Sequence, residues 1–346
     1  MSLNDYYRIS LMALVIVMLC SCTKSGSQGP LTVVSYGGGA YQQSHKTAFC
    51  EPFAQSTGIQ VNSVVWNADY GKLKAMVESG NVSWDVVDVT AAEYARGRRE
   101  SLFAKLSERP REDEFLPNSI ADDGVANVYW GTVLAFNRSA FPSKQPKSWA
   151  DFWNVKEFPG ARALYDDPRG NLEFALLADG VSREQLYPLD VERAFRKLDE
   201  VKPQIRVWWT DGTQPVQLLL NNSVAVSSAW SGRIYASPQA QSDISYTFNG
   251  AGLELDYWVI PRGSQNVAAA SRFIAFSSQP ETMARQAELV GYGPVNVQAL
   301  SHVSEKAKSQ LPTFKANWDV SFVINSEWWA LNEERIKTRW LSWKGK

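Results

Sequence analysis

Cysteine and histidine are scarce in this chain of 346 residues, which has three cysteines and two histidines. Cys20 and Cys22 lie near the N-terminus, so only Cys50 falls in the part expected to fold, and we expect no internal disulfide framework. Neither His45 nor His302 belongs to a His-Glu-x-x-His pair, and no Gly-x-Ser-x-Gly segment occurs. These absences argue against an exported hydrolase, and we expect no enzymatic activity, no cofactor and no metal.

An excess of charge of either sign is also missing. Lysine and arginine total 35, aspartate and glutamate total 36, and the formal net charge is -1. This balance gives no reason to expect a nucleic acid or an anionic membrane surface as a partner. Asp166 and Asp167 could suggest a glycosidase, but adjacent residues in an extended segment point apart and do not form an acid/base pair by themselves.

No apolar run is long enough to span a bilayer. The run at residues 9–19 follows Arg8 and predicts a secretory signal. It ends in Leu19-Cys20-Ser21-Cys22, which resembles the bacterial lipobox, so we expect a signal at 1–22, lipid on Cys22 and a polar tether at 23–30. The alternative is an ordinary cleaved signal peptide in which both cysteines occur by chance. The predicted location is the periplasm, with tethering to a membrane through Cys22.

Strand and helix patterns alternate through the rest of the chain. Strands are predicted at 31–36, 59–65 and 84–89, with a helix ending at Thr57-Gly58 and another at 72–79 between them. This βαβαβ order predicts an α/β fold with a parallel sheet. A further strand is expected at 129–137, followed by a helix with Ser148 as N-cap and Asp151 at its third position. Helices at 192–201, 267–276 and 280–289 and a tryptophan-rich end complete the chain, and those tryptophans are expected to pack rather than bind.

Three glycines, at 37–39, follow the first strand. A dinucleotide fingerprint is discarded because Gln42 stands where its third glycine belongs. The carboxyl end of a parallel strand is a usual place for ligands in open α/β sheets. The glycines indicate either such a site or only a tight turn into the helix.

The stretch at 253–261 is a strand-like run in which Asp256 stands among large rings. An ionised aspartate in such a run must be paired or must bind a cation. Asp256 is therefore either the anchor of a ligand or one half of a structural ion pair with an arginine or lysine.

Several stretches together resemble the periplasmic solute-binding proteins of bacterial ABC importers, of the spermidine/putrescine-binding type. They occur in the family's order over nearly all of the mature chain. The stretches are 36–41 (YGGGAY), 52–59, 84–87 (WDVV), 130–131, 148–153 (SWADFW), 256–261 (DYWVIP) and 291–296 (GYGPVN).

The resemblance implies a type II periplasmic-binding-protein fold, in which two α/β lobes close over a ligand cleft. By position, lobe 1 would comprise 31–132 and 253–300, and lobe 2 would comprise 133–252 and 301–346. The crossover segments would lie at 130–137 and 246–256. The implied partners are a small ligand and the permease and ATPase of an importer, and we expect a monomer.

The family binds amines by stacking methylene chains between aromatic rings and pairing ammonium groups with carboxylates. Carried over by position, this implies a set of ligand-binding residues and favours the ligand-anchor interpretation of Asp256. The set is Tyr36, Tyr41, Thr90, Asp167, Trp230, Arg233, Asp256 and Tyr292.

Two departures from the spermidine-binding pattern bear on the ligand. Gly170 stands where a second acid is expected, and Arg233 stands where a small residue is expected. A zwitterion would use Arg233 as a fork for its carboxylate, whereas a polycation fits poorly beside it unless the side chain points away. The other interpretation of Arg233 is a salt bridge to a nearby acid on the rim.

The leading hypothesis is a polyamine such as putrescine or spermidine, or another small cationic amine. The alternative is a zwitterionic ω-amino acid such as γ-aminobutyrate, and an exported hydrolase is more distant.

Overall fold

The computed structural model describes residues 29–67 and 69–345. The expected signal, Cys22 and most of the expected tether lie outside the described residues. Within them the chain builds one mixed sheet with the strand order β2-β1-β3-β8-β4-β7-β5-β6, to which β10 adds beside β8 and β9 beside β4. Among these residues no helix is both long and apolar enough to cross a membrane.

The strands are β1 (Leu31–Tyr36), β2 (Val61–Trp66), β3 (Val86–Thr90), β4 (Gly124–Asn137), β5 (Arg162–Tyr165), β6 (Ile205–Trp209), β7 (Val226–Trp230), β8 (Ile244–Val259), β9 (Gly293–Pro294) and β10 (Phe322–Val323). The helices are α1 (Gly39–His45), α2 (Glu51–Thr57), α3 (Tyr70–Glu78), α4 (Ala91–Arg99), α5 (Trp149–Trp153), α6 (Pro168–Ala178), α7 (Val191–Val201), α8 (Gln214–Leu220), α9 (Ser231–Tyr235), α10 (Pro238–Asp243), α11 (Val267–Ser277), α12 (Pro280–Val290), α13 (Glu305–Lys308), α14 (Lys315–Trp318) and α15 (Ser326–Lys344).

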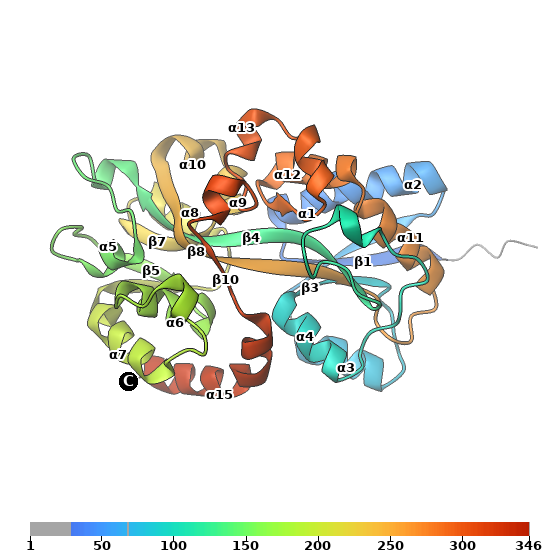
Figure 1. Cartoon of the computed structure of the whole chain (residues 1–346), viewed down its shortest axis with the longest axis horizontal. Helices are drawn as coiled ribbons and strands as arrows, with labels where there is room; N and C mark the ends of the chain where they lie inside the picture. Colours follow the sequence, from blue (N-terminus) through green and yellow to red (C-terminus); the bar gives the residue numbers. More distant parts are fainter. Residues whose placement is uncertain (1–28, 68, 346) are drawn as a thin grey trace, which may run out of the picture.

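The antiparallel pair β4 and β8 joins the two halves of the molecule. The pair runs from Asn137 opposite Ile244 to Gly124 opposite Val259, with two register shifts along it. On one side β3 pairs with the last residues of β8, and β1 and β2 continue that half. On the other side β7 pairs with β4, and β5 and β6 continue the other half. Figure 1 shows β4 and β8 running together between the two groups of helices.

Local sequence signals account for much of this arrangement. The parallel sheet predicted for the first three strands is confirmed, and β1 lies between β2 and β3. Ser148 caps α5 and forms a capping box with Asp151, as predicted. The predicted starts of the two long strands were wrong, because β4 begins at Gly124 rather than 129 and β8 at Ile244 rather than 253. The early part of each strand gains its hydrogen bonds from another strand far away in the sequence, which a local pattern does not reveal.

Two large apolar clusters make up the core, and the larger one continues across the joining strands into the half that carries Trp209 and Leu219. In the half built on β1 to β3 this larger cluster includes Phe49, Phe53 and Trp258, and the second cluster, in the other half, includes Trp149 and Trp329. Helix α15 packs on the second cluster and also contacts α4 of the first half. Its tryptophans therefore pack, as expected. The lobe boundaries at 132, 252 and 300 stay a prediction.

Candidate functional site

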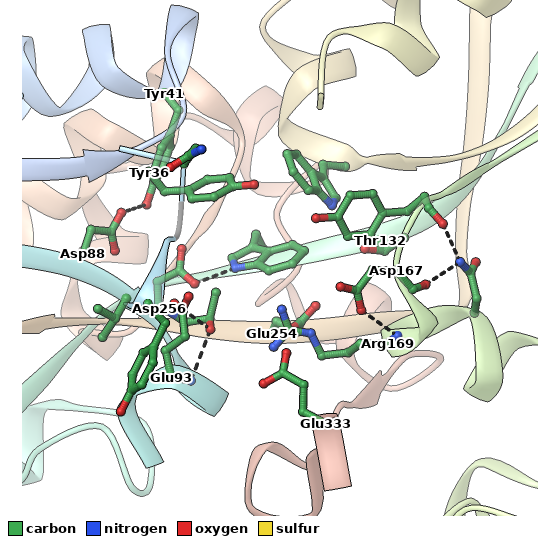
Figure 2. Close-up of a pocket in the computed structure, with 18 of the residues that line it drawn as sticks. Tyr36, Tyr41, Asp88, Glu93, Thr132, Asp167, Arg169, Glu254, Asp256 and Glu333 are labelled. Atoms are coloured by element: carbon green, nitrogen blue, oxygen red, sulfur yellow. Dashed lines mark hydrogen bonds and ion pairs between the residues drawn. The ribbon is translucent and has the colours of Figure 1, made fainter. Parts of the chain in front are cut away.

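A pocket of about 290 Å³ lies where the two halves meet. This is near the small end of the range, roughly 300–1,000 Å³, in which small-molecule sites fall. Its walls come from β1, β3, β4, β5, β7 and β8 and from helices α1, α3, α4, α6, α9 and α15 (Figure 2). All eight residues expected to bind a ligand line it: Tyr36, Tyr41, Thr90, Asp167, Trp230, Arg233, Asp256 and Tyr292. Their contact with a ligand stays a prediction.

Asp256 lies on β8 opposite Val128 of β4 and Thr90 of β3. It is only 6% exposed, and the indole nitrogen Nε1 of Trp130 donates to its Oδ1 at 2.8 Å. No ion pair between described residues includes Asp256. The structural ion pair with an arginine or lysine, one of the two interpretations of Asp256, is therefore not formed among them. Burial, together with the nearby charge of Asp88, raises the pKa of Asp256 well above its usual value.

Asp88, on β3, is a second buried carboxyl group at this end of the pocket. It is 1% exposed, and the Tyr41 hydroxyl donates to its Oδ2 at 2.9 Å. The Asn127 amide donates to its other oxygen at 3.5 Å. Burial raises the pKa of Asp88 to about 7. The two carboxyl groups meet only neutral donors, which makes this end of the pocket suited to a cation.

Aromatic rings form the wall beside these acids. The ring of Trp230, at the end of β7, lies 6.0 Å from that of Tyr36, 5.7 Å from that of Trp130 and 5.6 Å from that of Tyr165, all edge to face. Tyr41 and Tyr292 pack together with their centroids 5.5 Å apart. Such faces suit methylene groups and a cation placed over a ring.

Arg233, in α9, brings a guanidinium group to the same pocket. Its Nη1 donates to the Gly38 carbonyl at 3.2 Å, and its guanidinium carbon lies about 6 Å from the rings of Tyr41 and Trp230. Its Nε is buried without a hydrogen-bond partner. The ion pairs between described residues do not include Arg233, so the salt bridge to a rim acid is not formed. The glycine loop approaches it closely: a Cβ at Gly37 would lie 3.2 Å from Nη2.

Charged groups of opposite sign fill another part of the lining. Arg169 Nε lies 3.3 Å from Glu254 Oε2. The Asp167 carboxylate accepts from the backbone nitrogen of Arg169 and lies 3.5 Å from Lys337 Nζ, which also pairs with Glu333. Burial opposes the charge of Arg169, but Glu254 and Asp167 keep its pKa well above the usual value. Asp167 therefore has an N-cap role and a cation partner already.

Asp166 and Thr90 each have a structural partner. Asp166 binds Lys344 Nζ at 2.6 Å, away from the side that Asp167 presents to the pocket, so the two do not form an acid/base pair. Thr90 caps α4 and forms a capping box with Glu93. The Thr90 hydroxyl is thus engaged in holding the helix start beside the pocket.

The sequence-based prediction missed several lining residues. Glu254 could have been found, because it stands two residues from Asp256 and must share its face of the strand. Asp88 satisfied the criterion applied to Asp256, a carboxylate inside an apolar strand. Trp130 stands in one of the stretches that carry the family resemblance, and nothing local marks the others. The missed charged and aromatic residues are Tyr70, Asp88, Glu93, Arg96, Trp130, Tyr165, Arg169, Phe174, Glu254, Glu333, Glu334 and Lys337.

The sequence of this chain is similar to those of known binding proteins. The sequence profile described as bacterial extracellular solute-binding protein matches residues 48–316. The chain is 38% identical to the gamma-aminobutyric acid-binding protein of Pseudomonas aeruginosa, over 99% of this chain and 98% of that one. It is 24% identical to the spermidine/putrescine-binding periplasmic protein of Escherichia coli, over 80% of this chain and 81% of that one.

Solved structures show the same fold. An ABC transporter substrate-binding protein from Bradyrhizobium japonicum superposes with a TM-score of 0.86 at 36% identity, covering 91% of this chain and 99% of that one. A GABA receptor of known structure gives a TM-score of 0.84 at 36% identity, covering 92% and 98%. These similarities confirm the predicted α/β, two-lobed periplasmic-binding-protein fold.

Proposed function

The chain belongs to the bacterial extracellular solute-binding protein family and is the substrate-binding component of an ABC import system; from this premise we propose that it captures a zwitterionic ω-amino acid of the γ-aminobutyrate class. Proteins of this kind deliver small ligands to a permease that an ATPase drives. The ligand would lie in the pocket between β8 and α9, with its ammonium group at Asp256 and its carboxylate at Arg233.

One observation carries this proposal. The same pocket holds a buried carboxyl group that meets no cation, Asp256, and a guanidinium group that meets no carboxylate, Arg233, beside a wall of aromatic rings. A charge left unpaired in a desolvated pocket is costly, so a ligand with one charge of each sign is complementary to both. The names of two similar proteins, a gamma-aminobutyric acid-binding protein and a GABA receptor, support the same class.

The polyamine hypothesis is less well supported. The relatives named for spermidine and putrescine are 24–25% identical to this chain, against 38% for the relative named for γ-aminobutyrate. The guanidinium of Arg233 also lines the pocket, where it would repel an additional ammonium group.

Calorimetric titration separates the two ligand classes. The wild-type protein is titrated with γ-aminobutyrate, its homologue one carbon longer, putrescine and spermidine. We expect the amino acids to bind most tightly. Arg233→Ala should weaken them by roughly 2–5 kcal/mol, since truncating one partner of a buried charge pair costs that much. It should leave putrescine unchanged or tighter. Tighter binding of putrescine than of either amino acid by the wild-type protein would reject the proposal.

The remaining expectations are part of this proposal. The protein would bind its ligand without converting it, act as a monomer in the periplasm, and be tethered by lipid on Cys22. Recovery of unchanged ligand after prolonged incubation tests the first. Mass spectrometry of the mature N-terminus tests the last, and a free start at any other residue would reject it.

A further inference from the structure

One arginine lies among the carboxylates of the ligand pocket itself. Arg169 stands at the start of α6, where the backbone is not helical at Arg169 and where Gly170 has φ 84°. This irregular turn lies between the N-cap residue Asp167 and the regular part of α6. In Figure 2 the Arg169 side chain extends from the lobe that carries α6 toward Glu254 on β8. Its side chain is 13% exposed.

The partner of Arg169 stands on the same strand as the ligand anchor. Glu254 and Asp256 are two residues apart on β8, so their side chains lie on one face. Two residues of a strand span about 6.5–7 Å, which is close to the separation of the two nitrogens in an extended four-carbon diamine. Both carboxyl groups are less than 10% exposed. Without Arg169 this face of β8 would offer a diamine two acids at a matching spacing.

Every other cation in this part of the pocket is already engaged. Lys337 pairs with Asp167 and Glu333, and Arg96 pairs with Glu100 and Glu334. Among the described residues, Glu254 forms its ion pair with Arg169. Asp256 and Asp88 accept hydrogen bonds from neutral donors instead. On this face of β8 the protein therefore balances the charge of Glu254 with its own cation and leaves Asp256 without one in the described part of the chain.

We propose that Arg169 is a specificity-determining residue: its guanidinium group takes the place that the second ammonium group of a diamine would occupy, so the pocket accepts ligands with a single cationic group. The inference rests on the proposed function and deepens it, because it assigns the rejection of diamines to a residue that does not hold the amino acid. Arg233 selects for the ligand's carboxylate, and Arg169 selects against a second cation.

The test compares the ratio of putrescine affinity to γ-aminobutyrate affinity in four variants, each checked for folding by its melting curve. Arg169→Met leaves Glu254 unpaired and should raise the ratio by at least about tenfold, because an ammonium group can then pair with the acid. Arg169→Met with Glu254→Gln removes that acid and should abolish the gain. Arg169→Lys keeps the cation and should keep the wild-type ratio. If Arg169→Met does not fold, Arg169→Gln carries the same expectation: its amide can still donate to Glu254, which supports folding, but it brings no positive charge to balance the acid.

The outcomes separate this inference from the proposed function. If the wild-type protein binds γ-aminobutyrate but the folded Arg169→Met or Arg169→Gln variant shows an unchanged ratio, the role of Arg169 is wrong and the proposed ligand class stands. An equal rise of the ratio in the double variant also overturns the role of Arg169, because the rise then comes from the smaller side chain at position 169 and not from the unpaired charge of Glu254. A wild-type protein that prefers putrescine rejects the proposed function itself.

Discussion

Asp88 and Asp256 face the same pocket as two buried acids, and their protonation must respond to a ligand. Burial raises the pKa of both, to about 7 for Asp88 and well above the usual value for Asp256. An ammonium group favours the ionised form of Asp256, so its arrival must expel a proton wherever that group was protonated. The empty and occupied pockets therefore differ in proton content.

We expect affinity for an ω-amino acid to rise with pH between 5 and 8. Below the raised pKa of Asp256 the ligand must displace a proton, which weakens binding as the pH falls. Calorimetry in buffers of different ionisation enthalpy at one pH should reveal proton release on binding. The Asp256→Asn variant is the control, because it should bind weakly and lose most of this pH dependence. Equal affinity at pH 5 and pH 8, with no proton release, would contradict the assignment.

The same raised pKa values make a prediction for the unliganded protein. A carboxyl group whose folded-state pKa is raised binds its proton more tightly in the folded state than in the unfolded state. For Asp88 that stabilisation is complete below about pH 4, its unfolded range, and is lost as the pH rises through about 7. The Asp88→Asn variant cannot lose a proton there, so we expect it to reduce the fall in unfolding free energy between pH 5 and pH 8.

The expected difference is roughly 2–4 kcal/mol, at about 1.4 kcal/mol per pKa unit. Urea unfolding of both proteins at pH 5 and pH 8, without ligand, measures it. Asp85, a neighbouring buried acid that accepts from Thr32, Ser264 and Asn266, supplies the matched control. Asp85→Asn removes a structural acceptor and should destabilise at both pH values. A wild-type protein more stable at pH 8 than at pH 5 would show that the sign is wrong.

At the scale of residues, chemical type predicted part of the site. A carboxylate in an apolar strand has few explanations, which is why Asp256 could be singled out from the sequence. The direction of a side chain could not be predicted. Arg169 and Glu333 lie in ordinary polar stretches, and only the packing of α6 against β8 and of α15 against α4 and α6 brings them to the pocket. Trp230 and Arg233 needed the resemblance to a family as well as their residue type.

Among the helices, α15 connects the two halves through two unlike kinds of contact. Trp329 is fully buried in the second apolar cluster, and its indole Nε1 donates to Glu173 at 2.7 Å. Toward α4, Glu327 pairs with Arg99 and Glu334 pairs with Arg96, with the glutamate side chains 74% and 80% exposed. Exposed pairs of this kind contribute little to stability, whereas a buried indole contributes much.

We therefore expect Trp329→Ala to lower the free energy of unfolding by about 3–5 kcal/mol, since it opens a cavity and leaves the buried Glu173 with one donor fewer. Glu327→Ala, on the same helix, should change it by less than about 1 kcal/mol. Chemical denaturation of the two variants beside the wild type gives both values. Similar losses in the two variants would mean that α15 is held by its ion pairs instead.

Elements with a local signature were predictable, and those that depend on distant partners were less so. The capping box of Ser148 and Asp151 marks the start of α5. Gly58 and Gly291 mark the ends of α2 and α12, in the left-handed conformation that favours glycine. The predicted ranges, 129–137 and 253–261, cover only part of the long β4 and β8. Their outer parts are strands only because each supplies the other's hydrogen bonds.

For the molecule as a whole, the proposed function requires the two halves to move toward each other around the ligand. Closure shortens the particle, so we expect small-angle scattering to give a smaller radius of gyration with saturating ligand than without. The Asp256→Asn variant at the same ligand concentration should scatter like the empty protein, because it binds too weakly to close. An unchanged radius for saturated wild-type protein would contradict closure.

The joining strands β4 and β8 also determine where such a motion turns. Their ladder is interrupted between Ala126 and Val128 and between Thr132 and Leu134. Val128 is paired with Asp256, and Thr132 is paired with Trp230. In mechanical terms, a ligand at the proposed site would sit at the fulcrum, and each half would be a long lever arm. A small adjustment beside the two strands would then be enlarged at the far rims, so that the distance between the arms would report whether the pocket is full.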